Sequence, residues 1–349
     1  MTTGALALIG MVAGALAPTK PAFAADQLTV TSTGGAYQTS LRKAVFEPFS
    51  KVTGIKITED EYNGEIAKIH AMVESKSVSW DVVDNDMISV MQLCAEGLLE
   101  TIDWNRLGLD RAKFLGGNNQ DCGLPNFTSA RVIAYDKDKL PNGPKTIADF
   151  FDLQKFPGKR GLRKEPRGNL EWALIADGVP TKDVYKVLDT PEGVDRAFKK
   201  LDTIKKDVVW WQAGAQPPQL LADGQVVMTS IFNGRIYDAV KNSGKHFEIM
   251  WDAQYLEVSV WTIPKGSPRL DDAYKFFAFA GSPKAQAELT DYLPYGPTNE
   301  DAIALVRPAM LPHFPNAPDH MGNALLRDAA FWVEKGDDLR QRFTAWLAK

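Results

Sequence analysis

Apolar and polar positions alternate along the chain with two periodicities, which predict strands followed by helices. Residues 28–32 form a short apolar run typical of a buried strand, and Gly34 and Gly35 then lead into a segment with apolar side chains three and four residues apart. That segment ends at Gly54, the residue type that favours the left-handed cap of a helix. The order repeats with a strand at 55–61, a helix at 65–75, a strand at 80–84 and a helix at 89–96 ended by Gly97. This alternation predicts a mainly parallel α/β sheet with helices on both faces.

A second alternating unit begins with a predicted strand at 131–136. Further strands are expected at 208–211, 226–231, 247–251 and 258–263, and helices at 146–153, 169–176 and 191–204. Beyond residue 268 the pattern is mostly helical, with candidates at 271–280, 283–291, 321–334 and 337–348. A chain of 349 residues also exceeds the size at which one hydrophobic core usually stops growing, so two domains are expected.

The charge pattern excludes one class of function. The 40 lysines and arginines nearly balance the 44 aspartates and glutamates, and no long run of one sign occurs. A binder of nucleic-acid backbones needs a basic face, so no nucleic-acid partner is expected.

The first 24 residues resemble an export signal. Residues 5–16 form an apolar run too short to span a bilayer, and Ala22-Phe23-Ala24 has the small-x-small pattern that signal peptidase reads. No lysine or arginine precedes the run, so an uncleaved anchor remains the alternative. No later stretch approaches the roughly 20 apolar residues of a membrane helix. The expected location is therefore the periplasm.

An oxidising compartment allows the two cysteines, Cys94 and Cys122, to form a disulfide. The alternative is two separate buried thiols, the usual fate of isolated cysteines. Export favours the disulfide.

Catalytic and metal-binding motifs are absent from the sequence. It contains no G-x-S-x-G, H-E-x-x-H or Walker A motif, and its four histidines lack the spacing of metal ligands. The acidic pair Asp84 and Asp86 allows one enzymatic alternative, a secreted hydrolase. We expect no enzyme, no cofactor and no metal site.

A set of short landmarks resembles the spermidine/putrescine-binding family of periplasmic receptors over essentially the whole mature sequence. Their order and spacing together carry the resemblance, since no single one is diagnostic. They are FSKVTGIK at 49–56, WDVV at 80–83, EGLLETID at 96–103, DGQV at 223–226, IFNG at 231–234, IP at 263–264, SP at 282–283 and YGPTN at 295–299.

The resemblance implies the type 2 periplasmic-binding fold, an α/β architecture with two lobes, a hinge and a ligand cleft between the lobes. Lobe 1 is expected to comprise residues 25–133 and 264–312, and lobe 2 residues 134–263 and 313–349. The implied function is that of a solute-binding receptor, which closes on its ligand. It is expected to be a monomer whose partner is an ABC permease in the inner membrane.

 

The family positions that contact ligand map onto both predicted lobes. Two glycines and an aromatic residue follow the first strand, acids follow later strands, and aromatic residues near the hinge suit aliphatic chains and ammonium groups. The expected ligand-binding residues are Gly34, Gly35, Tyr37, Asp84, Asp86, Glu165, Phe232, Arg235, Glu257, Ser259 and Tyr295.

Three departures from the polyamine binders bear on the ligand. Ser259 and Gly168 stand where that family has amine-binding acids, and Arg235 stands where it has a small residue. An arginine repels a dication but clamps a carboxylate with two hydrogen bonds. We therefore expect a ligand with an amine at one end and a carboxylate at the other, such as γ-aminobutyrate, with putrescine or spermidine as the alternative.

Each of the main site residues also has a structural alternative. Tyr37 could only pack its helix against the sheet, Asp84 could cap the next helix, and Arg235 could point to solvent. Ferric iron is disfavoured as a ligand because Tyr292 and Tyr295 are not adjacent, as the paired tyrosines of iron receptors are.

Overall fold

The computed structural model describes Met1 and residues 27–62, 64 and 66–349. The export signal expected at residues 1–24 thus lies, apart from Met1, outside the described residues.

The strands form one mixed sheet in the order β2-β1-β3-β8-β4-β7-β5-β6. In one half, β1 is parallel to β2 and β3, and in the other half β5 is parallel to β6 and β7. Between them the long strands β4 and β8 run antiparallel to each other and to their outer neighbours. The strands are β1 (Gln27–Ser32), β2 (Lys56–Glu61), β3 (Val82–Asp86), β4 (Gly123–Asp136), β5 (Arg160–Arg163), β6 (Val208–Trp211), β7 (Met228–Phe232), β8 (Phe247–Thr262), β9 (Gly296–Pro297) and β10 (Leu325–Leu326).

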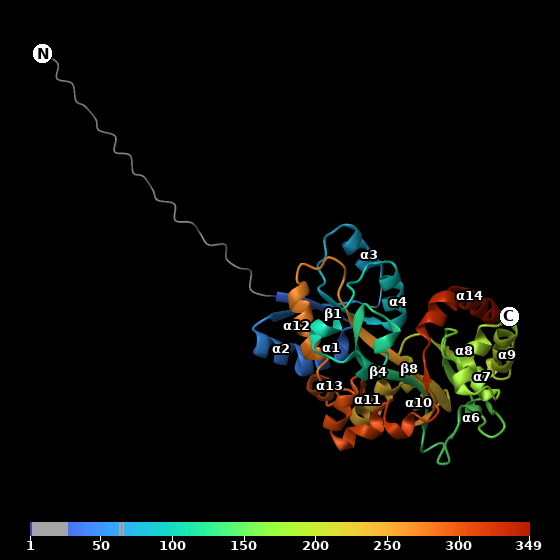
Figure 1. Ribbon diagram of the computed structural model, residues 1–349. Helices are drawn as coiled ribbons and strands as arrows, with labels where there is room; N and C mark the ends of the chain where they lie inside the picture. The colour runs from blue at the N-terminus through green and yellow to red at the C-terminus, as the bar shows by residue number, and fades with distance from the viewer. Residues whose placement is uncertain (2–26, 63, 65) are drawn as a thin grey trace.

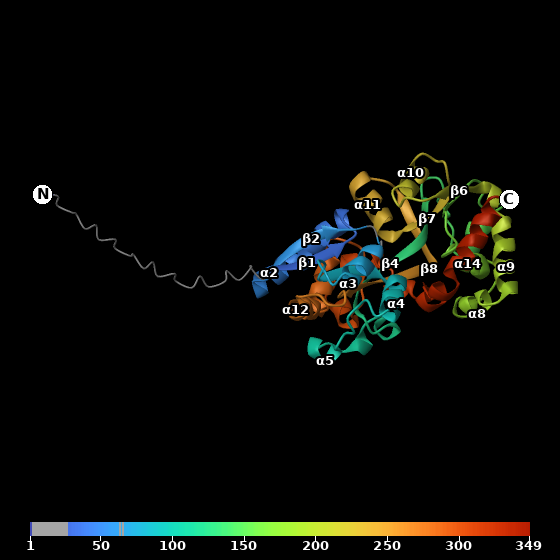
Figure 2. The same ribbon diagram turned by 90° about the horizontal axis from the view of Figure 1, so that it is seen from above.

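The helices gather in two groups at opposite ends of this sheet (Figures 1 and 2). The first half carries α1 (Gly35–Leu41), α2 (Glu47–Thr53), α3 (Ala67–Glu74), α4 (Met87–Ala95), α5 (Trp104–Leu107), α12 (Leu270–Ala280) and α13 (Pro283–Leu289), with a π-helical turn at Arg42–Phe46 between α1 and α2. The second half carries α6 (Ile147–Phe151), α7 (Asn169–Ala176), α8 (Val184–Leu188), α9 (Pro191–Asp202), α10 (Gln216–Ala222), α11 (Asn233–Ser243) and α14 (Ala329–Leu347). Short 3₁₀ turns occupy Arg111–Lys113, Gly117–Asn119, Thr181–Asp183, Lys205–Asp207, Glu300–Leu305, Pro308–His313 and Pro318–His320.

The two long strands correct the sequence prediction. β4 begins at Gly123 rather than at residue 131, and the strands expected at 247–251 and 258–263 are one strand, β8. Polar residues, among them Gln254, lie between those two apolar runs. In the structure Gln254 is buried and its amide donates to the carbonyl oxygens of Pro315 and His320, at 2.6 and 2.8 Å. A polar side chain with such partners can lie inside a buried strand.

The C-terminal helices also differ from the prediction. The helices expected at 321–334 and 337–348 are a single helix, α14, which begins after the Asp328 N-cap. Gly336 lies buried inside it, with Trp332 as its nearest neighbour, and does not interrupt it. The residues before the cap instead form β10, which pairs with β8.

The ladder between β4 and β8 changes register at the junction of the two halves. Residues 123–131 of β4 pair with 255–262 of β8, whereas residues 133–136 pair with 247–250. The unpaired stretch of β8 contains Ala253, which has a positive φ of 53° and whose carbonyl oxygen accepts a 2.7 Å hydrogen bond from the Trp172 indole. An extra segment of this kind bends a strand and increases its twist.

Each half has its own hydrophobic core. Phe49, Trp261 and Phe276 are central in the first half, and Trp172 and Phe343 belong to the core of the second. The last helix, α14, therefore packs on the second half, while α12 and α13 pack on the first. No helix within the described residues is long and apolar enough to cross a membrane.

Candidate functional site

A cavity of about 550 Å³ lies where the two halves meet. Its walls come from the ends of β1 and β3, the middle of β4 and β8, and the start of α11. Nine of the expected ligand-binding residues line it: Gly34, Tyr37, Asp84, Asp86, Phe232, Arg235, Glu257, Ser259 and Tyr295. The sheet brings these residues together because parallel strands place their carboxyl ends at one edge.

Asp84 forms the centre of a buried polar network at this cavity. Its carboxylate accepts hydrogen bonds from the Tyr37 hydroxyl at 2.8 Å and from the Ser259 hydroxyl at 2.6 Å. The Asn126 amide donates in turn to the Tyr37 oxygen at 3.0 Å. Burial raises the pKa of Asp84 to about 6, although these hydrogen bonds act to lower it. In the described part of the chain no cationic side chain pairs with Asp84, so its charge has only neutral partners.

The N-cap of α4 shows which member of the acidic pair Asp84 and Asp86 caps this helix. Asp86, not Asp84, is the N-cap, and its carboxylate accepts from the Ile88 backbone amide at 3.0 Å. Asp84 lies inside β3, two residues earlier than the cap. It is therefore available to the cavity.

Aromatic rings form an apolar wall beside Asp84. Phe127 stacks on Tyr295 with ring centroids 4.6 Å apart, and Tyr37 meets the edge of Phe127 at 5.1 Å. Tyr37 thus both packs and lines the cavity. Phe127 was missed from the sequence, because no strand was expected where it lies.

Arg235 lies in the first turn of α11, on the other side of the junction from β3. Its side chain is exposed and lines the cavity, and it has neither a hydrogen bond nor an ion pair with the other described residues. Asp238, one turn further along the same helix, also lines the cavity. Arg235 is thus the counterpart of Asp84: a charged group at the cavity without an opposite charge paired to it.

Two further acids of the cavity, Asp86 and Glu257, are paired with an arginine. Arg327 lies 3.3 Å from Asp86 and 3.4 Å from Glu257, and the side chain of Arg327 is only 6% exposed. Desolvation acts to raise the pKa of Asp86, but Arg327 and the Ser89 hydroxyl hold it below its ordinary value. Arg327 was missed from the sequence because it falls in the stretch that had been expected to be helical.

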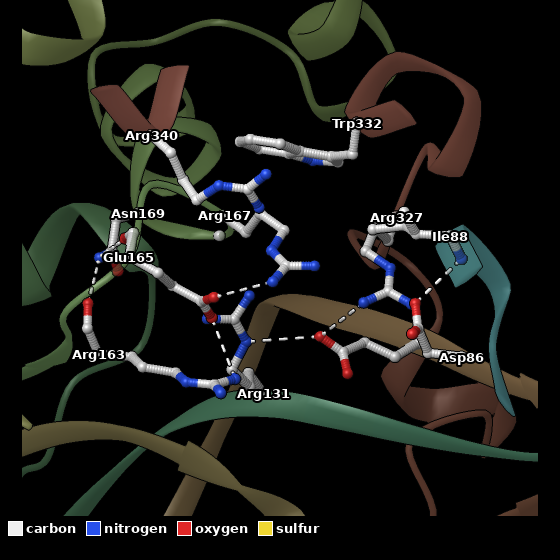
Figure 3. Close-up of polar contacts among 12 residues, drawn as sticks. Asp86, Ile88, Arg131, Arg163, Glu165, Arg167, Asn169, Arg327, Trp332 and Arg340 are labelled. Carbon is white, nitrogen blue, oxygen red and sulfur yellow. Dashed lines mark hydrogen bonds and ion pairs between the residues drawn. The ribbon is translucent and has the colours of Figure 1, made fainter. Parts of the chain in front are cut away.

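One expected site residue, Glu165, does not line this cavity. Gly35 is the first residue of α1 and lies next to Gly34. Glu165 forms ion pairs with Arg131 at 2.9 Å, Arg163 at 3.1 Å and Arg167 at 3.3 Å (Figure 3). Burial acts to raise the pKa of Glu165, and the three arginines nevertheless hold it below its ordinary value.

The cysteines form the expected disulfide. Cys94 near the end of α4 is bonded to Cys122, the residue before β4, with the two Cα atoms 5.7 Å apart. The bond ties a helix of the first half to the strand that leads into the second.

The fold and the cavity define a class, the periplasmic-type binding receptors with a ligand site between two halves. Residues 44–316 match the family described as bacterial extracellular solute-binding protein. The chain belongs to this family of receptors for ABC importers, which are not enzymes.

Individual relatives cover nearly the whole chain. A γ-aminobutyric acid-binding protein of Pseudomonas aeruginosa is 44% identical over 344 residues, which is 99% of this chain and 96% of the relative. The spermidine/putrescine-binding periplasmic protein of Escherichia coli is 22% identical over 76% of each chain. Among solved structures, one described as the Atu4243–GABA receptor is similar with a TM-score of 0.82 and 35% identity, covering 93% of this chain and 98% of the other.

Proposed function

We propose that this receptor binds a small zwitterion with an amine at one end and a carboxylate at the other, of the γ-aminobutyrate type. One observation carries the proposal. Two charged groups of opposite sign, Asp84 and Arg235, lie at the same cavity, and neither is paired with a charged group among the described residues. An ammonium group would pair with Asp84, and a carboxylate would be clamped by the guanidinium of Arg235.

The wall between the two charges suits a short aliphatic chain. The rings of Phe127 and Tyr295 present apolar faces, which pack methylene groups and attract a nearby ammonium. The γ-aminobutyric acid-binding relative at 44% identity supports the same ligand class.

The polyamine alternative has less support from the site. A diamine needs a second carboxylate, but Asp86 and Glu257 are both paired with Arg327, and Asp238 lies one helical turn from the positive charge of Arg235. The polyamine-binding relatives are 22–24% identical to this chain.

The transport cycle proposed for this receptor follows from its two halves. Lobe 1 (25–133 and 264–312) and lobe 2 (134–263 and 313–349) would close on the ligand, and the closed monomer would deliver it to the permease of the importer. Residues 1–24 would direct export to the periplasm. Ligand contacts that exist only in the closed state would shift the population toward that state.

Replacing Arg235 tests the ligand class. Arg235→Ala should weaken γ-aminobutyrate binding by about 2–5 kcal/mol, because the ligand carboxylate, which closure of the lobes would bury, loses its partner. Putrescine binding should stay the same or become stronger, since a positive charge is removed. Isothermal titration of both ligands measures the two effects.

Lys241→Ala is the matched control, because Lys241 is an exposed cation on the same helix that does not line this cavity. It should leave both affinities unchanged. Undiminished γ-aminobutyrate binding by Arg235→Ala would exclude the carboxylate clamp.

A further inference from the structure

Two of the carboxylates at the ligand cavity are neutralised by the protein itself. The guanidinium of Arg327 bridges them, with Nη2 3.3 Å from Asp86 Oδ1 and Nη1 3.4 Å from Glu257 Oε1. All three residues line the cavity. Arg327 therefore occupies a position where two negative charges face the ligand space.

A second arginine, Arg131, also lies close to Glu257. Arg131 is almost fully buried, and its Nε lies 3.6 Å from Glu257 Oε1 while its Nη1 lies 2.9 Å from Glu165 Oε1. Figure 3 shows the guanidinium groups of Arg131, Arg163 and Arg167 gathered around Glu165, with Arg327 beside Asp86.

The arginines of this cluster outnumber its carboxylates, so the cluster has no unpaired negative charge for a cationic ligand. Four arginines (Arg131, Arg163, Arg167 and Arg327) face three carboxylates (Asp86, Glu165 and Glu257). Of the carboxylates placed at the cavity by β3 and β8, only Asp84 has no cationic partner in the described structure.

We infer that Arg327 is a specificity-determining residue: a built-in cation that takes the place of a ligand's second ammonium and so restricts the cavity to monoamines. The inference rests on the proposed function, in which Asp84 receives the single amine. A diamine entering this cavity would meet the positive charge of Arg327 and would find, on the side formed by β3 and β8, no second carboxylate without a cationic partner. Without Arg327, Asp86 would lose its cationic partner and Glu257 would keep only Arg131, so the two carboxylates would instead attract a ligand cation.

The test is a gain of function. Arg327→Gln leaves Asp86 and Glu257 without their bridging cation, and we expect it to bind putrescine at least tenfold more tightly than the parent does. A residue that only stabilised the fold would not produce such a gain when removed. Isothermal titration with putrescine and with γ-aminobutyrate measures both affinities, and thermal unfolding by circular dichroism checks that the variant is folded.

Two further variants make the test specific. In Asp86→Asn/Glu257→Gln/Arg327→Gln the arginine is lost but both carboxylates are lost with it, so the gain in putrescine binding should disappear. Arg342→Gln removes an arginine of α14 that pairs with Asp195 and lies apart from the cavity, and it should change neither affinity.

If Arg327→Gln does not fold, Glu257→Gln/Arg327→Gln removes one charge of each sign and still frees Asp86, so it should show the gain. The inference is overturned if a folded variant of either kind binds putrescine no better than the parent, or if the triple variant gains as much. Failure of the proposed function looks different: the parent would then not bind γ-aminobutyrate, whatever the variants do with putrescine.

Discussion

At the scale of single residues, the burial of the Asp84 carboxylate beside the cavity lowers the stability of the folded protein at neutral pH. Its pKa is raised to about 6 in the folded protein by burial, against an ordinary value of 3.8. The folded state thus binds this proton more tightly than the unfolded state does. The stability linked to Asp84 is fully present below pH 4 and is lost as the pH rises through 6. A shift of about two pKa units corresponds to roughly 3 kcal/mol.

Asp84→Asn should therefore stabilise the ligand-free protein at neutral pH. We expect the free energy of unfolding to rise by about 1–3 kcal/mol at pH 7.5 and to change little at pH 4, because the parent carboxyl is then protonated in the folded state. Urea unfolding at the two pH values measures this difference. Equal effects at both pH values would show that the charge of Asp84 is not the cause. The same variant should lose binding of amine ligands.

The sequence located nine residues of the cavity but not which of their charges are paired with each other. The positions after strands identified Tyr37, Asp84 and Arg235, and all three line the cavity. The pattern could not show that Glu257 is paired with Arg327, because the two lie 70 positions apart in the chain and meet only through the pairing of β10 with β8. The spacing of residues along a helix or strand predicts on which face a side chain lies. It does not predict which charged residue from a distant part of the chain pairs with it.

At the scale of elements, the disulfide joins the end of α4 to the start of β4. The two cysteines are 28 residues apart, so the bond closes a loop in the unfolded chain and lowers its entropy. The bond acts within the first half and at the entry to the junction.

Replacing both cysteines by alanine should lower the free energy of unfolding by about 3–4 kcal/mol, the value that loop-closure entropy gives for this separation. Urea unfolding of Cys94→Ala/Cys122→Ala and of the parent under non-reducing conditions measures the loss. Reductant serves as the control, since it should destabilise only the parent. A double variant as stable as the oxidised parent would contradict the prediction.

At the scale of the whole molecule, two hydrophobic cores are connected through β4 and β8. The register shift between these strands lies beside the cavity, and Glu257 and Ser259 follow it on β8. A change of angle at this junction would move α11 and Arg235 relative to β3 and Asp84. Closure and ligand contact are thus expected to be one event.

Small-angle X-ray scattering tests this coupling. Saturating γ-aminobutyrate should reduce the radius of gyration of the parent, because the ligand bridges Asp84 and Arg235. Arg235→Ala at the same ligand concentration should show a smaller reduction or none. Identical scattering of the parent with and without bound ligand would exclude closure.

The sequence by itself determined the class of fold, most element positions and nine residues of the cavity. Hydrophobic periodicity is a local property, and so are the glycine caps such as Gly54, which has the left-handed conformation expected of it. The family landmarks indicated the class of receptor, and the departure at Arg235 suggested the ligand class. Only the tertiary structure decided that β8 is continuous, that α14 is one helix, and that Arg327 neutralises two acids of the cavity. These outcomes depend on partners far away in the chain, and the energy of a buried polar group is set by those partners rather than by its neighbours in sequence.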